Sequence, residues 1–125
     1  MYENLALLRT ADQMARHAGA RQALVARNMA NSDTPGYRAS TIAPFAEAYE
    51  GRDRAMRATR AGHLGFETDV PAPVEEVGGE ASPNGNTVSL EMEMIQAASV
   101  EREHTRALAV YRHTLTVLRT VISGR

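Results

Sequence analysis

The sequence predicts an all-α, elongated protein whose long N- and C-terminal helices pack as an antiparallel, coiled-coil-like pair, with an irregular middle region between them. Three observations predict this. Two long proline-free stretches repeat apolar residues at spacings of three and four. All five prolines and seven of the nine glycines lie between those stretches. A helix over residues 89–122 would be about 51 Å long, whereas a compact 125-residue domain is only about 36 Å across.

The N-terminal segment, residues 1–30, is predicted to be one helix. It contains no proline and a single glycine, Gly19. Its apolar stripe is shallow and rich in alanine, which permits close approach of a neighbouring helix. The residues expected to pack there are Leu8, Ala15, Val25 and Met29.

The stretch NMANSDTPGYRA then predicts a firm helix stop. Asn31 is expected to adopt the left-handed conformation that ends a helix. Thr34 precedes a proline and is therefore pushed out of helical space. Pro35 and Gly36 suit the two corners of a type II turn. Tyr37 gives the outgoing chain an amphipathic ring that can dock.

The middle region, residues 31–86, combines this turn with an irregular segment. FAEAYEGRDRAMRATRAGHL could hold a short helix. ETDVPAPVEEVGGEASPNGN is typical of extended chain and turns. We expect this region to be partly mobile.

The C-terminal segment, residues 87–125, is predicted to be the second long helix. Ser89 is its expected N-cap, and Glu91 and Glu93 fall in its first turn, which suits the helix dipole. Its last four turns are apolar around much of their circumference, so one neighbouring helix would not cover them. The residues expected to pack are Leu108, Tyr111, Leu115, Val117, Leu118 and Ile122.

Composition and motifs argue against an enzyme. The net charge of −1 does not suit a general nucleic-acid binder, and the absence of cysteine excludes disulfides and thiolate chemistry. Glu101 and His104 have the spacing of a di-iron ligand pair, but no second such motif exists. We expect no catalytic residue, metal or cofactor. We also expect no cleaved signal peptide and no direct membrane insertion, because the required apolar runs are missing.

Two motifs at opposite ends of the chain resemble those of bacterial flagellar rod and hook proteins. The first is Asn-x-Ala-Asn-x-x-Thr-Pro-Gly-Tyr after an N-terminal helix, and the second is NGNTVSLEMEMIQAA. The resemblance covers residues 3–42 and 84–123. The chain length and the segment ATRAGHLGF are most similar to the short proximal rod proteins. Ser89 stands where the family commonly has Asp. The residues of the first motif are Asn28, Ala30, Asn31, Thr34, Pro35, Gly36 and Tyr37.

The resemblance implies a structural subunit of the basal-body rod that self-assembles through its terminal helices and transmits torque from the motor. Implied partners are other rod subunits (FlgC-like and FlgF-like proteins), the MS-ring/rod junction proteins and the flagellar type III export apparatus. The implied location is the rod in the periplasmic space, reached by export without cleavage. In this family the turn would be an assembly motif that keeps the helix ends in register. The alternative is a soluble helical adaptor or export chaperone of the same secretion system.

Overall fold

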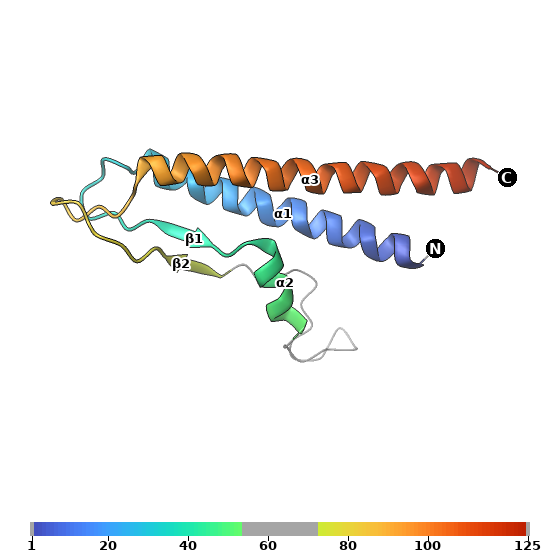
Figure 1. Cartoon of the computed structure of the whole chain (residues 1–125), viewed down its shortest axis with the longest axis horizontal. Coiled ribbons are helices and arrows are strands. Elements are labelled where there is room, and N and C mark those ends of the chain that lie inside the picture. Colours follow the sequence, from blue (N-terminus) through green and yellow to red (C-terminus); the bar gives the residue numbers. More distant parts are fainter. Residues whose placement is uncertain (1, 54–72, 125) are drawn as a thin grey trace.

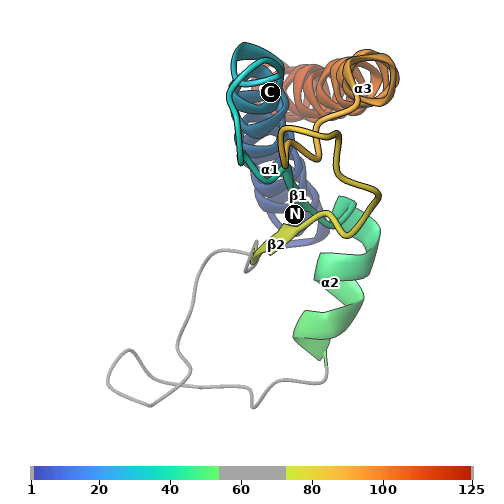
Figure 2. The ribbon, with the colours of Figure 1, turned by 90° about the vertical axis from the view of Figure 1, so that its left-hand side faces the viewer.

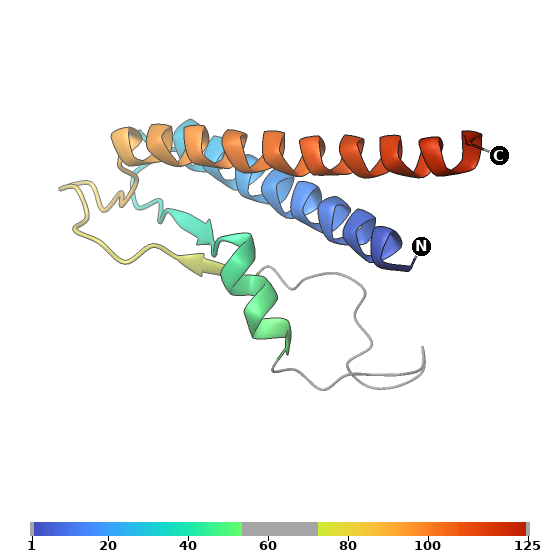
Figure 3. The same ribbon diagram turned by 45° about the vertical axis from the view of Figure 1, so that its right-hand side comes forward.

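The computed structural model describes residues 2–53 and 73–124 and is dominated by two long antiparallel helices (Figure 1). Both chain termini lie at the same end of this pair, and the helices diverge towards them (Figures 1 and 3). The predicted elongated helix pair is thus confirmed. The elements in chain order are α1 (Tyr2–Ala30), β1 (Ser40–Ile42), α2 (Phe45–Asp53), β2 (Val74–Glu76) and α3 (Leu90–Ser123).

The expectation of an all-α fold is only approximately correct, because β1 and β2 form a two-stranded antiparallel sheet. Ser40 lies opposite Glu76, and Ile42 lies opposite Val74. Ile42 is buried, whereas every residue of β2 is exposed. Each strand has three residues, which is too short for an alternating pattern to stand out in the sequence.

The end of α1 differs from the expectation in its mechanism. Asn31 does not have a positive φ; within the described residues only Gly36 and Gly85 do. Instead, the Asn31 side chain donates a hydrogen bond of 2.8 Å to the carbonyl oxygen of Arg27. The side-chain amide thereby satisfies a terminal carbonyl that a left-handed residue would otherwise help to satisfy.

The start of α3 is as predicted. Ser89 has extended backbone angles of φ −101° and ψ 109°, and its hydroxyl accepts a hydrogen bond from the Met92 N–H. That bond is long, at 3.5 Å. The helix runs for 34 residues from there and is therefore about 51 Å long.

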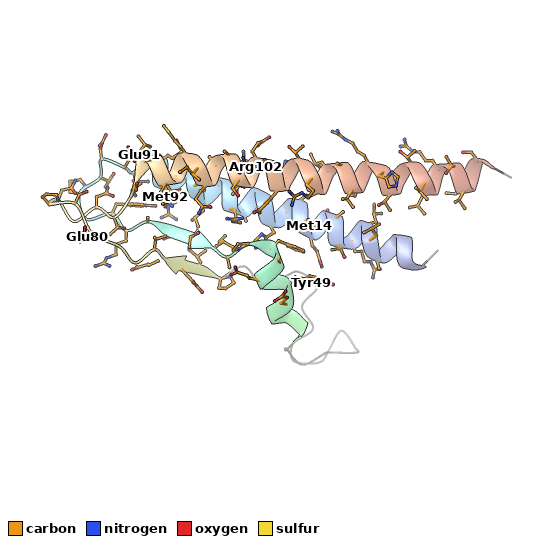
Figure 4. The ribbon with its side chains drawn as sticks, viewed as in Figure 1. Met14, Tyr49, Glu80, Glu91, Met92 and Arg102 are labelled. Carbon is orange, nitrogen blue, oxygen red and sulfur yellow. The ribbon has the colours of Figure 1, made fainter. Side chains whose placement is uncertain are left out.

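The short helix expected in the middle region is α2, and it projects from the side of the helix pair that also carries the two strands (Figure 2). Its first residue, Phe45, meets the ring of His17 on α1 edge-on, with ring centroids 5.6 Å apart. Tyr49 follows one turn later on α2 (Figure 4). The remainder of the expected helical segment and the segment ATRAGHLGF lie outside the described residues.

The seam between α1 and α3 is built from small side chains. Ala11 and Ala18 of α1 are 1% exposed, and Val100 and Ala107 of α3 are completely buried. Thr114 continues the seam at the same seven-residue spacing along α3. Such small residues let the helix axes approach closely, but they bury little apolar area.

The residues expected to form the helix interface mostly flank this seam. Ile122 is 75% exposed, so the free chain leaves it uncovered. The others are half-buried: Leu8, Ala15, Val25, Met29, Leu108, Tyr111, Leu115, Val117 and Leu118. The described helices include none that is long and apolar enough to cross a membrane.

Candidate functional site: an asparagine clamp at the closed end of the helix pair

Two buried asparagines join the loops at the closed end of the helix pair, where α1 ends and α3 begins (Figure 1). Asn28 is 1% exposed and Asn86 is 2% exposed. Asn28 lies in the last turn of α1, and Asn86 lies four residues before α3. We call these two side chains, with the loops 31–37 and 82–88, the asparagine clamp.

Asn86 donates hydrogen bonds to backbone carbonyls in the segment that follows α1. Its Nδ2 donates to the carbonyl oxygens of Asn31, Ser32 and Thr34 at 2.8, 2.9 and 2.8 Å. Its Oδ1 accepts from the Val88 N–H at 2.7 Å. An amide nitrogen has two hydrogens, so one of them is shared between two carbonyls. The stop at the end of α1 is therefore held by a residue more than fifty positions further along the chain.

Asn28 connects four parts of the structure. Its Nδ2 donates to the Ser40 carbonyl oxygen at 2.8 Å and to Glu93 Oε1 at 3.0 Å. Its Oδ1 accepts from the Tyr37 hydroxyl and from the Ser40 N–H, both at 3.2 Å. All the hydrogen-bonding capacity of the amide is used. Asn28 thereby fixes α1, the turn, β1 and α3 relative to one another.

The turn itself has the expected geometry. The Tyr37 N–H donates to the Thr34 carbonyl oxygen at 3.2 Å, and Gly36 has a φ of 71°. These are the features of a type II turn. The Gly36 N–H also donates to the carbonyl oxygen of Asn84 at 2.9 Å, which joins the turn to the second loop.

Thr87 continues the connection towards β1. Its N–H donates to the Tyr37 carbonyl oxygen at 3.0 Å, and its Oγ1 accepts from the Ala39 N–H at 2.8 Å. The strand that leaves the turn and the chain that enters α3 are therefore hydrogen-bonded side by side. Glu80 lies in the loop that approaches this end of the molecule (Figure 4).

Glu93 brings a carboxyl group into the clamp. It is 7% exposed, and Asn28 donates to it. Burial raises the pKa of Glu93, and the hydrogen bond from Asn28 partly opposes that rise. The sequence places Glu93 in the first turn of the helix, where a solvent-exposed acid is common, so its burial was not anticipated.

Further along the pair, Arg21 of α1 makes a second polar contact with α3. Its Nη1 donates to both carboxylate oxygens of Glu103, at 2.8 and 2.7 Å. Its Nη2 donates to Gln96 Oε1 at 3.2 Å.

His17 lies one turn before Arg21 on α1 and is 5% exposed, and neither ring nitrogen has a hydrogen-bond partner within the described chain. Burial lowers the pKa of His17, as does the nearby Arg21, while Glu103 opposes this.

The structure brings most of the turn motif together but not all of it. Asn28, Asn31, Gly36 and Tyr37 take part in the clamp, and Thr34 contributes its carbonyl oxygen. Ala30 and Pro35 are exposed. The residues that sequence reasoning missed are all polar, and all but the first lie far from the turn in sequence: Arg21, Asn86, Thr87, Glu93 and Glu103.

The acidic motif near the middle of α3 has a structural role. Glu103 is held by Arg21, whereas Glu101 is exposed. Among the described residues, no group of three or more His, Asp or Glu side chains could hold a metal ion. The arrangement is suited to fixing two helices and two loops in one geometry.

Comparison with known proteins relates the chain to a protein of the flagellar rod. No family model matches the chain. The flagellar basal body rod protein FlgB of Agrobacterium fabrum is 31% identical to it over 108 residues, which cover 78% of this chain and 78% of that protein.

Proposed function

The chain belongs to the family of the flagellar basal body rod protein FlgB, and from this premise we propose that it is a proximal-rod subunit that self-assembles through its terminal helices. Membership makes it a component of the flagellar basal body rod. That it assembles through α1 and α3, and that it transmits torque from the motor, is our proposal. We propose no catalytic activity and no cofactor.

The observation that carries the proposal is the apolar surface that the free helix pair leaves uncovered, which at the start of α3 includes Met92 and Met94 at 55% exposure and Ile95 at 62%. The closed end is held by the asparagine clamp. At the open end Leu5 and Leu7 are each 46% exposed, Val121 is 55% exposed and Ile122 is 75% exposed. Apolar side chains that a chain leaves uncovered mark a surface for protein contacts. We propose that neighbouring subunits of the rod cover them.

The clamp also suits a subunit that is under mechanical load. A shaft subunit that transmits torque must keep its two helices from sliding against each other. The Asn28 and Asn86 amides tie both helix ends through eight hydrogen bonds between 2.7 and 3.2 Å, which are directional and resist sliding. This supports a rigid joint where α1, the turn and α3 meet.

We further propose the partners and route that follow from a place in the rod. The neighbours would be FlgC-like and FlgF-like rod subunits and the MS-ring/rod junction proteins. The flagellar type III export apparatus would deliver the chain, without cleavage, to the periplasmic part of the rod. An adaptor or export chaperone would instead remain with the export apparatus.

The test is a density map of basal bodies purified from cells that carry this chain. We expect density for α1 and α3 in the proximal rod, with Ile122 enclosed by neighbouring subunits. A chain missing from the purified rod, but recovered with the export apparatus, would favour the adaptor. A strain with the gene deleted serves as the control, since its basal bodies should lack that density.

A further inference from the structure

Arg21 spans two turns of the facing helix. It lies seven residues before Asn28 on α1, hence about 10 Å from the clamp along the helix axis. Its side chain is 7% exposed, and the Glu103 side chain is 28% exposed. The guanidinium donates to both carboxylate oxygens of Glu103 and also to Gln96. It therefore joins α1 to two separate points on α3.

These two points make the contact sensitive to rotation. Gln96 and Glu103 are seven residues apart, close to two full helical turns, so both face α1. The guanidinium is planar and its donors form a fixed fork. Turning α3 by one residue, about 100°, would carry both acceptors away from Arg21 together.

Beyond Arg21, on the side of the chain termini, the most deeply buried residues of the seam are all small: Ala11, Ala18, Ala107 and Thr114. A buried methyl contributes only about 0.8 kcal/mol, and small side chains do not interlock as large ones do. Packing alone would thus leave several rotations of the two helices similar in energy.

We infer that Arg21 is a positioning residue that sets the rotation and separation of α1 and α3 on the side of the chain termini. The clamp holds the other end. The role is geometric rather than stabilising, because a buried ion pair often adds little net stability over an apolar pair of similar size. This inference concerns the helix pair of the free chain and does not depend on the proposed place in the rod.

The test compares the wild-type chain with the double variant Arg21→Met, Glu103→Leu. The chain has no cysteine, so spin labels on introduced cysteines report only the chosen sites. Labels at the exposed positions Arg9 and Arg112 report the termini side. We expect one narrow distance distribution in the wild type and a broad or displaced one in the double variant, with no loss of Tm.

Two controls separate positioning from general damage. Labels at the exposed positions Ala26 and Glu91 report the clamp side, where the distribution should stay narrow in both proteins. The charge exchange Arg21→Glu, Glu103→Arg keeps the attraction and should restore the narrow distribution, whereas Arg21→Glu alone should not. The inference would be overturned if the distance distribution on the termini side stayed narrow in the apolar double variant. It would also be overturned if that distribution were as broad in the charge exchange as in Arg21→Glu alone.

Discussion

Gly36 and Gly85 meet backbone to backbone at the closed end of the helix pair. A Cβ atom on Gly85 would lie 3.4 Å from the Gly36 Cα. Both residues have positive φ, 71° and 82°, and each belongs to a different loop of the clamp. The two loops therefore touch where each needs the conformational freedom of glycine.

This relationship predicts that Gly36→Val prevents rod assembly. A β-branched residue at positive φ costs about 1–3 kcal/mol, and that strain would act on the turn that Asn86 holds. We expect export to continue and swimming to fail. Gly78→Val is the matched control, because Gly78 has open space around it and no positive φ. Normal motility of the Gly36→Val strain would show that the turn has no special role.

Asn86→Asp should destabilise the folded chain, because it removes the amide donors and places a buried negative charge beside three carbonyl oxygens. An Asp carboxylate can still accept from Val88, but it cannot donate to the three carbonyls that Asn86 now satisfies. Leaving buried carbonyls unsatisfied costs about 1–3 kcal/mol for each group that water does not reach. Urea denaturation measures the loss, and Asn84→Asp, at an exposed position in the same loop, is the control. Equal stability of the two variants would contradict the clamp.

Sequence reasoning predicted the helices well because their signals are local. The absence of proline, the turn after Asn31 and the cap at Ser89 each depend on a few adjacent residues. The seam was less predictable, since Arg21 and Glu93 carry no apolar signal although both face the partner helix. The three carbonyl oxygens that Asn86 binds lie more than fifty residues away, and no local pattern shows those contacts.

Glu93→Gln should make the protein more stable at neutral pH. Because burial raises the pKa of Glu93, the folded chain binds a proton more readily than the unfolded chain, whose Glu pKa is 4.5. Wild-type stability therefore falls as pH rises from 4.5 through the folded pKa. Gln can still accept from Asn28 and has no charge to bury. Unfolding free energies at several pH values measure this, with Glu91→Gln at an exposed position as the control.

His17 should make the stability of the folded chain depend on pH in the opposite direction. Its pKa is lowered on folding, so the unfolded chain binds the proton more readily, and stability falls as pH drops from 6.5 through the folded pKa. His17→Leu should remove this loss and keep an apolar contact for Phe45. The measurement is Tm between pH 7.5 and pH 5, with His113→Leu at an exposed position as the control. If the wild-type Tm falls no faster across this range than the Tm of His17→Leu, then His17 is not a neutral, buried histidine.

The exposed end of α3 should matter for rod assembly but not for the stability of the free chain. Ile122 is 75% exposed, so Ile122→Asp should change the unfolding free energy by no more than about 0.5 kcal/mol. In the rod, however, an aspartate at a covered position would bury an unpaired charge. We therefore expect a folded, soluble and exported protein that fails to form rods, which basal-body purification would reveal.

Two further variants make this outcome specific. Ala107→Asp places the same charge in the completely buried seam, so it should unfold the free chain before assembly is reached. Thr120→Asp places it at an exposed position beside the apolar end of α3 and tests whether any added charge is harmful. If Ile122→Asp assembles as well as Thr120→Asp, the end of α3 faces solvent in the rod. The uncovered apolar residues would then not be the contact surface, and assembly through the helix ends would be wrong even with the clamp intact.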